Sequence, residues 1–470
     1  MILDDTISAI STPPGSGAIA IVRLAGSRAI TIAGEVFRPA GKGKKLETQP
    51  ANTVHFGTLT DGEKEIDEVV VTLFRAPHSF TGDDIVEISC HGAPYIQQKI
   101  LQVLNDHGAR LAGPGEFTQR AFLNGKMDLS QAEAVADLIA ARSESARRVA
   151  LKQMKGGFSG ELVNLRTKLL EFTSLIELEL DFSEEDVEFA DRTQLIELVN
   201  EIDRVLKRLI DSFSLGNAIK NGIPVAIVGH TNAGKSTLLN ALLREEKAIV
   251  TEVHGTTRDA IEDVMNIEGI TFRFIDTAGI RDTIDKVESM GIALTYSKIK
   301  QASIVLLMMD VRDEDEKIHK AVSDIKEHLS DENQQLIVVV NKTDLVSQEE
   351  VENRFSGQAF RELTGTDAIV PLSAKHHTNL DDLVTELLKT VNLGAVDNDE
   401  VVVTNARHYE ALKNAREGII RTRKGLETGL SGDFLAQDIR EVLHFLGEIT
   451  GQISTDEVLG NIFKNFCIGK

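Results

Sequence analysis

The sequence predicts a multidomain α/β protein with an α+β domain at its N-terminus and an all-α domain that is interrupted by an inserted parallel α/β domain. Short β-branched runs dominate the first part of the chain, and long amphipathic helices follow them. Apolar strand-like runs then alternate with helical stretches before helical periodicity returns. At 470 residues, the chain also exceeds what one core usually organises. We expect domain boundaries at 1–125 (α+β), 126–217 and 389–470 (helical), and 218–388 (inserted α/β).

The N-terminal strands are predicted from three runs, IAIVRL (19–24), EVVVTLF (68–74) and DIVEISC (84–90). In the helical part, SQAE from Ser130 and STDE from Ser454 match the capping-box pattern, so each predicts a helix start. Apolar residues then recur at helical spacing, at Leu162, Leu165, Leu169, Ile176 and Leu180.

The inserted domain is predicted from five buried-type strands with helical stretches between them. Such near-continuous apolar runs are typical of parallel strands that are covered on both faces. They are PVAIV (224–228), FRFID (272–276), IVLLMMD (304–310), LIVVVN (336–341) and AIVPLS (368–373).

Composition and charge limit the classes of function. The formal net charge of −22 argues against a broad basic face that grips nucleic acid, so a local patch or a second protein would have to supply much of any RNA contact. The two cysteines, Cys90 and Cys467, lie far apart and outside any ligand cluster, which is typical of the reducing cytoplasm. We expect no membrane span and no export signal.

The stretch GHTNAGKST from Gly229 fits the phosphate-binding pattern GxxxxGK[ST] between a predicted strand and a predicted helix. Glycines permit a tight loop whose backbone N–H groups surround phosphates. Lys235 is expected to reach the β and γ phosphates, and the Ser236 hydroxyl to bind Mg²⁺. The predicted nucleotide contacts of this loop are Asn232, Ala233, Gly234, Lys235, Ser236 and Thr237.

Three further motifs predict that the nucleotide is GTP. DTAG (276–279) ends a strand with an acid near the metal and a glycine near the γ-phosphate. In NKTD (341–344), the Asp344 carboxylate can accept from guanine N1–H and N2–H₂, which adenine lacks. SAK (373–375) follows the last strand. The predicted contacts are Asp276, Thr277, Ala278, Gly279, Asn341, Lys342, Asp344, Ser373, Ala374 and Lys375.

Between the first two motifs, TEVHGTTRD (251–259) contains two candidates for a segment that closes on Mg²⁺ and the γ-phosphate, Thr256 and Thr257. A threonine-rich turn after Gly255 is the alternative. The nucleotide contacts predicted here are Thr251, Glu252, Val253, His254, Gly255, Thr256 and Thr257.

Ile280 follows DTAG at the position where Ras-like GTPases carry a glutamine that orients the attacking water. Isoleucine has no hydrogen-bonding group, so it cannot hold that water. Either the nucleotide is not hydrolysed or another group replaces the amide.

The NAGKS loop, the GTTRD segment and the apolar residue after DTAG resemble the TrmE-Era-EngA-like branch of GTPases. Within it, four stretches narrow the resemblance to the MnmE (TrmE) family of tRNA-modification GTPases. They are TPPGSGAIAIVRLAG (12–26), SFTGDDIVEISCHG (79–92), PGEFTQRAFLNGKMDLSQAEA (114–134) and the terminal FCIGK (466–470). The resemblance covers the whole chain and implies a Ras-like GTPase domain inserted into the helical domain.

The resemblance also implies what replaces the missing amide. K⁺ would be held by Asn232, Thr251, Val253 and Thr256, with Mg²⁺ held by Ser236 and Thr257. A fixed cation beside the phosphates supplies the charge that an arginine finger supplies elsewhere. Glu288 matches the proposed water-orienting glutamate, and a solvated helix acid is the alternative.

For the N-terminal domain, the resemblance implies dimer formation and binding of 5-formyl-tetrahydrofolate or a related folate. The implied contacts are Arg23, Glu87, Lys126 and Lys470, with Cys467 a candidate catalytic residue. Cations suit the glutamate tail of folate, and a carboxylate suits the pterin donors. A small buried hydrophobe is the alternative for a free cysteine. His91 follows Cys90 on a strand, so we expect the two side chains to point to opposite faces.

The resemblance implies a homodimer that works with the flavoprotein MnmG, in a heterotetramer, on tRNA. Together they would install a carboxymethylaminomethyl group at C5 of the wobble uridine with a folate one-carbon unit. Two alternatives stay open. A ribosome-assembly GTPase of the Era or EngA type would bind rRNA, and a signalling GTPase would carry an unrelated dimer arm.

Overall fold

The computed structural model describes residues 5–41, 43–181, 192–244, 263–275, 299–329, 334–355, 360, 368–390, 401–464 and 466–469. These divide into two compact units. One contains Met1–Ala140, Ala150–Asp203 and Ala411–Lys470, and the other contains Ala141–Val149 and Arg204–Glu410. Within the described ranges, no helix is long and apolar enough to cross a membrane.

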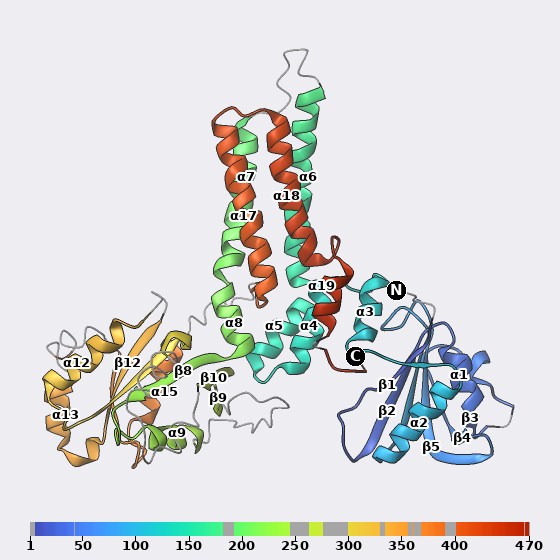
Figure 1. The fold of residues 1–470 in the computed structure, drawn as a ribbon, viewed down its shortest axis with the longest axis horizontal. Coiled ribbons are helices and arrows are strands. Elements are labelled where there is room, and N and C mark those ends of the chain that lie inside the picture. The colour runs from blue at the N-terminus through green and yellow to red at the C-terminus, as the bar shows by residue number, and fades with distance from the viewer. Residues whose placement is uncertain are drawn as a thin grey trace. The chain divides into compact units, whose positions relative to one another are not determined.

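The N-terminal part of the first unit is an α+β layer structure (Figure 1). Its described strands form one mixed sheet in the order β3-β4-β5-β6-β2-β1-β7. Helices α1 (Ala29–Val36) and α2 (Pro94–Asp106) pack on this sheet through an apolar core. The strands are β1 (Ile7–Ile10), β2 (Gly17–Ala25), β3 (Phe37–Pro39), β4 (Thr53–Asp61), β5 (Lys64–Phe74), β6 (Ile85–Gly92) and β7 (Arg110–Leu111).

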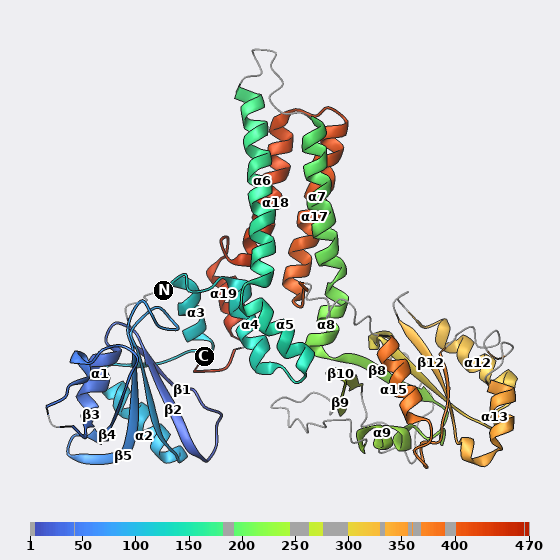
Figure 2. The same cartoon turned by 180° about the vertical axis from the view of Figure 1, so that it is seen from behind.

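The helical part of the first unit follows α3 (Glu116–Leu123) and is dominated by long helices that lie side by side (Figures 1 and 2). Apolar residues at helical spacing are buried between them, and these include Leu162, Leu165, Leu169 and Ile176, as predicted. Helices α4 (Leu129–Ala140), α6 (Gly157–Asp181), α18 (Gly432–Thr450) and α19 (Asp456–Phe463) lie within this unit. Three more helices have residues in both units, and they are α5 (Glu144–Met154), α7 (Arg192–Asp211) and α17 (Ala406–Glu427).

Both predicted capping boxes are wrong by one or two residues. Helix α4 is capped by Asp128, whose carboxylate accepts from the Gln131 backbone N–H at 2.9 Å while the Gln131 side chain accepts from the Asp128 N–H at 2.9 Å. Ser130 lies inside the helix and donates to Asp128. Helix α19 is capped by Thr455, which accepts from Val458. A carboxylate or hydroxyl one or two positions earlier or later satisfies the same orphan donors, so local spacing does not select between them.

The second unit contains a sheet in the order β13-β12-β11-β8-β10-β9, in which β9 is antiparallel to β10 and the other described pairs are parallel. Its strands are β8 (Ile223–Gly229), β9 (Asp263–Ile267), β10 (Ile270–Phe274), β11 (Ile304–Asp310), β12 (Gln335–Asn341) and β13 (Ile369–Pro371). The five predicted strand runs correspond to β8, β10, β11, β12 and β13.

Helices cover both faces of this sheet, which explains its continuous apolar runs. Along β8, Val225 and Ile227 join one core cluster, and Ala226 and Val228 join the other. Helices α9 (Lys235–Arg244) and α15 (Leu380–Lys389) contribute to the first cluster. Helices α12 (Asp315–Lys326) and α13 (Gln348–Phe355) contribute to the second, and α8 (Phe213–Asn221) leads into β8.

Candidate functional site

The predicted nucleotide-binding segments follow neighbouring parallel strands of the second unit. The loop from Gly229 follows β8, the NKTD segment follows β12, and the SAK segment follows β13. Strand β11 lies between β8 and β12, and β13 pairs with β12. Because parallel strands end at the same edge of a sheet, the structure gathers these segments in the place where open α/β sheets bind ligands.

The phosphate-loop glycines occupy positions that exclude any side chain. Gly229 has φ +147, and a Cβ there would lie 2.4 Å from the Met308 carbonyl oxygen. Gly234 has φ +101, and a Cβ there would lie 2.2 Å from Nδ2 of Asn341. Asn232 also has a positive φ, 63, which asparagine tolerates better than most residues. The loop is therefore a close-packed cradle of backbone that fits a phosphate chain.

The positive charge of the loop is already positioned. Lys235 is the first residue of α9, and its ammonium donates to the carbonyls of Gly229 at 2.8 Å and His230 at 2.9 Å. Ser236 is half-buried in the first turn, and Thr237 beside it is exposed. A helix N-terminus with a lysine and a serine suits a phosphate and the hard cation that accompanies it.

Asn341 joins the three loops at the sheet edge. Its side chain is buried, with 3% exposed. Its Nδ2 donates to the carbonyl of Ala233 in the phosphate loop at 2.8 Å, and its Oδ1 accepts from the backbone N–H of Ala374 at 3.0 Å. Both polar ends of the amide are thus used for positioning the loops on either side.

The Asp344 carboxylate is oriented by the loop after β13. It lies in the short 3₁₀ turn Thr343–Leu345, and its Oδ1 accepts from the Ser373 hydroxyl at 2.6 Å. This hydrogen bond is the largest of the interactions that lower the pKa of Asp344 below its usual range. The group therefore remains an anion, which is the form that accepts the N–H donors of guanine.

One residue of the arrangement escaped the sequence analysis. Asp310 ends β11 between the two motif-bearing strands, and its carboxylate accepts from Lys342 at 2.8 Å. Arg312 also donates to it, and this hydrogen bond is the main cause of the strongly lowered pKa of Asp310. The sequence feature that could have identified Asp310 is its position in IVLLMMD, where an acidic residue ends a buried strand.

Several predicted residues lie outside the described part of the structure. They are Thr251, Glu252, Val253, His254, Gly255, Thr256, Thr257, Asp276, Thr277, Ala278, Gly279, Ile280 and Glu288. Among the residues that are described, no three His, Cys, Asp or Glu side chains gather as metal ligands. Two of the residues predicted to bind cations are described, and they are Ser236, which is half-buried, and Asn232, which is exposed. The predicted nucleotide contact Lys375 is also exposed.

In the first unit, the predicted folate contacts Arg23 and Glu87 face each other across β2 and β6. The guanidinium donates to one Glu87 oxygen from Nε at 2.9 Å and Nη2 at 2.8 Å, and it lies over the Phe117 ring at 5.6 Å. Nη1 reaches the carbonyl of Gly469 at 3.3 Å. Arg23 and Glu87 therefore form an ion pair, and the folate contact predicted for each of them stays a prediction.

The C-terminal tail lies against the N-terminal sheet. The Gly469 carbonyl also accepts from Ser11 at 3.0 Å, and the Cys467 carbonyl accepts from Gly115 N–H at 3.2 Å. Gly469 has φ +94, and a Cβ there would lie 2.3 Å from the Ile10 carbonyl. This docking brings the exposed Cys467 thiol onto the unit that holds Arg23.

The remaining predictions for the N-terminal domain concern two lysines and the Cys90–His91 pair. Lys126 donates to the Pro77 carbonyl at 2.9 Å, and Lys470 lies outside the described residues. Cys90 is buried, which raises the pKa of its thiol to about 11, and His91 is exposed and bonded to Asp67 at 2.7 Å. The two side chains do point to opposite faces.

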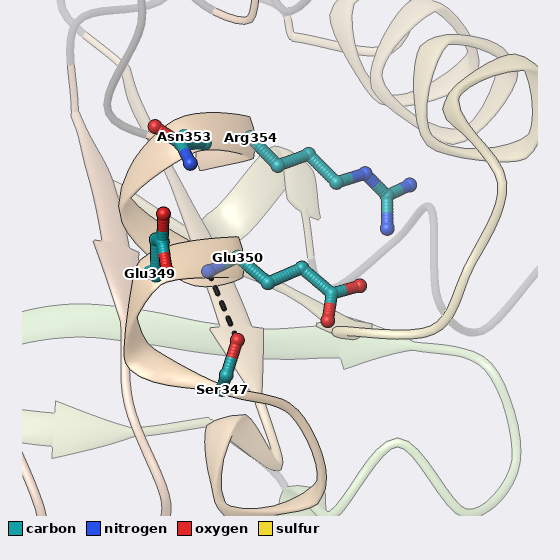
Figure 3. A pocket seen from close by; sticks show the side chains of 5 residues that line it. All are labelled: Ser347, Glu349, Glu350, Asn353 and Arg354. Carbon is teal, nitrogen blue, oxygen red and sulfur yellow. Dashed lines mark hydrogen bonds between the residues drawn. The ribbon is translucent and has the colours of Figure 1, made fainter.

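A hollow of about 420 Å³ lies on α13 and is lined by Ser347, Glu349, Glu350, Asn353 and Arg354 (Figure 3). The Ser347 hydroxyl accepts from the backbone N–H of Glu350 at 3.3 Å. None of the predicted nucleotide-binding residues lines it. We therefore assign it no part in nucleotide binding.

Two family descriptions match this chain. "GTP-binding protein TrmE N-terminus" matches residues 6–126, and "MnmE helical domain" matches residues 129–467. The tRNA modification GTPase MnmE of Bacteroides fragilis is 55% identical over 99% of this chain and 99% of its own length. That of Flavobacterium psychrophilum is 53% identical over the full length of both. A crystal structure of Era with 16S ribosomal RNA is 28% identical over 42% of this chain and 66% of that chain, with a TM-score of 0.27.

Gly234→Ala should weaken GDP binding by about 10- to 100-fold, because the new methyl group meets the Asn341 amide at a backbone angle that costs an L-residue about 1 to 3 kcal/mol. Titration with fluorescent GDP measures it. Gly160→Ala is the matched control, since a Cβ there meets nothing within 4 Å. Unchanged affinity in Gly234→Ala would show that the cradle is looser than this geometry.

Proposed function

The chain belongs to the MnmE family of tRNA modification GTPases, and from this premise we propose that it works with the flavoprotein MnmG on the wobble uridine of certain tRNAs. The two would install a carboxymethylaminomethyl group at C5, with a tetrahydrofolate derivative as the one-carbon source. The observation that carries the proposal is identity above 50% along the whole chain with relatives named for tRNA modification.

GTP hydrolysis is the activity of the second unit. The cradle at Gly234, the ammonium of Lys235 and the acceptor Asp344 supply groups for the phosphates and for guanine. Mg²⁺ would be held by Ser236 and by Thr257, which lies outside the described residues. When bound, the ion neutralises charge on the phosphate oxygens.

We further propose that K⁺ and Glu288 together replace the glutamine whose position Ile280 occupies. Asn232, whose backbone has a positive φ, is the described residue offered to this ion, and Thr251, Val253 and Thr256 would complete its shell. Glu288 would orient the water. Positive charge placed at the phosphates by an arginine finger is worth about 10³ to 10⁵ in rate, so a bound cation is large enough to matter.

The folate would bind at the Arg23–Glu87 pair. Because Arg23 satisfies one Glu87 oxygen through two donors, the other oxygen is offered to the amino and N–H groups of a pterin. Lys126 and Lys470 would serve the glutamate tail of the folate. Cys467 is the proposed reactive group on the tail that lies against this sheet.

Both the net charge and the family of this chain support the partners that we propose. A net charge of −22 leaves the tRNA phosphates poorly matched by this chain alone, so MnmG would supply much of the contact. We propose a homodimer formed through the N-terminal domain, a heterotetramer with MnmG, and action in the cytoplasm.

Deletion of the gene should remove the C5 modification from the wobble uridines that carry it, and mass spectrometry of tRNA nucleosides measures this. Restoring the wild-type gene is the control. Intact modification with defective ribosomal subunits would support instead the rRNA-binding alternative, and intact modification with intact ribosomes would support a signalling GTPase.

GTP hydrolysis should be at least about tenfold faster in K⁺ than in Na⁺ at matched ionic strength, because the bound K⁺ would supply positive charge beside the phosphates. Glu288→Ala should lower the rate by about 10² or more in K⁺. Phosphate release measures both rates, and Glu349→Ala on α13 is the acidic control. Equal rates in the two salts would exclude the potassium site.

Glu87→Gln should weaken binding of 5-formyl-tetrahydrofolate by about tenfold or more, since an amide loses one acceptor and the charge that holds Arg23. Calorimetry on the full chain measures it. Arg38→Ala is the control, because Arg38 is an exposed cation that bonds to the Gly62 carbonyl. Equal affinity in Glu87→Gln and wild type would remove this carboxylate from the folate site.

A further inference from the structure

The acid that ends β11 holds the lysine of the predicted guanine segment. Oδ2 of Asp310 accepts from the Lys342 ammonium at 2.8 Å, and only 15% of the Asp310 side chain and 29% of the Lys342 side chain are exposed. A partly buried ion pair of this kind is screened less by solvent and salt than a surface pair. In the pairing of β11 with β12, Asp310 lies opposite Asn341, the residue just before Lys342. The ion pair therefore joins two strand ends at the edge where the nucleotide segments gather.

The backbone of Lys342 begins the turn that carries Asp344. Lys342 has φ 67 and ψ 35, in the left-handed region that residues other than glycine seldom adopt. Its carbonyl accepts from the backbone N–H of Leu345 at 3.0 Å, which closes the 3₁₀ turn Thr343–Leu345 around Asp344. A residue keeps such a conformation when its surroundings determine it. The ion pair with Asp310 fixes the side chain of this residue.

The Asp310 carboxylate is itself fixed by the residues that follow it. Oδ1 accepts from the backbone N–H of Arg312 at 3.1 Å and from its Nε at 2.9 Å, and Oδ2 accepts from its Nη2 at 2.8 Å. The backbone N–H of Asp310 donates to the Asp313 carboxylate at 2.9 Å. Because these contacts set the position of the carboxylate, it is a fixed point against which Lys342 is held.

The Asp344 carboxylate is held from two sides. On the β13 side, the Ser373 hydroxyl donates to Oδ1 at 2.6 Å, and Nε2 of His376 lies 3.7 Å from Oδ2. On the β11 side, the turn that carries the carboxylate begins at Lys342, which is tied to Asp310. The N1–H and N2–H₂ groups of guanine point in the same direction and require two acceptor oxygens side by side. The direction in which the carboxylate faces the base therefore depends on both supports.

We propose that Asp310 is a positioning residue for guanine recognition, which acts through Lys342 to hold the Asp344 carboxylate toward the N1–H and N2–H₂ donors of the base. Hypoxanthine keeps the N1–H group and lacks the N2 amino group. A carboxylate that is free to turn loses the second of the two hydrogen bonds that guanine requires, so selectivity for guanine falls. Loss of the Asp310 charge should therefore weaken binding of GDP more than binding of inosine diphosphate. A general loosening of the sheet would weaken both nucleotides by the same factor.

The inference rests on the guanine site proposed for this chain, and the preference of the wild type for GDP over inosine diphosphate tests that premise by itself. Calorimetric titration of the full chain with each nucleotide compares the wild type, Asp310→Asn, Lys342→Met and the double variant. Asp61→Asn is the matched control, because it breaks an Asp–Lys pair of the same length, 2.8 Å to Lys99, in the first unit. Circular dichroism reports whether each variant is folded.

Asp310→Asn should lower the affinity for GDP by about tenfold and the affinity for inosine diphosphate by about threefold or less, the scale of partly lost hydrogen bonds to a charged acceptor. In the Lys342→Met background, the same substitution should change the GDP affinity by less than about twofold, because its effect passes through the lysine. Asp61→Asn should bind both nucleotides as the wild type does.

An unchanged preference for GDP in Asp310→Asn would overturn the proposal and leave the guanine site standing. An equal effect of the substitution with and without Lys342 would overturn it too, since Asp310 would then not act through the lysine. Unfolding of Asp310→Asn would assign the residue a structural role instead. Absence of a preference for GDP in the wild type would overturn the guanine site and the proposal with it.

Discussion

The proposed nucleotide site depends on the side chain of Asn341. This amide ends a buried central strand, donates to the phosphate loop at Ala233 and accepts from the base-recognition loop at Ala374. The first loop is the one that we propose to bind the phosphates, and the second is the one that we propose to bind the base. A single planar group with one donor end and one acceptor end thus sets the distance between phosphate recognition and base recognition. It also explains Gly234, since the space that a methyl group would need is filled by the same amide.

The charged groups at this edge are held in place by neighbouring groups of the protein. Lys235 lies on carbonyls of its own loop, Lys342 on Asp310, and Asp344 on Ser373. Fixed charges of this kind cost little reorganisation when a ligand binds, which is the basis of electrostatic preorganisation. The same hydrogen-bonding neighbours lower the pKa values of Asp310 and Asp344, because they favour the ionised forms of the two carboxyl groups.

In the N-terminal domain, one arginine side chain contacts two segments that are far apart in the sequence. Arg23 is shared by Glu87 from the adjacent strand and by the carbonyl of Gly469, 446 residues later in the chain. The close approach of the tail is possible because Gly469 has no side chain to strike Ile10. The tail is therefore part of the surroundings of this ion pair, and the properties of the pair depend on both ends of the chain.

The sequence by itself determined the strands and the long helices, and it predicted which segments bind phosphate and guanine, because apolar periodicity and fixed local spacing are properties of neighbouring residues. Local spacing did not decide which residue caps α4, since Asp128 and Ser130 both offer a suitable acceptor. Only the tertiary structure decided that Asp310 holds Lys342, that His376 stands against Asp344, and that Arg23 and Glu87 form a pair. These contacts join residues that share no motif, and their geometry is set by strand order and loop closure, which one-dimensional spacing does not encode.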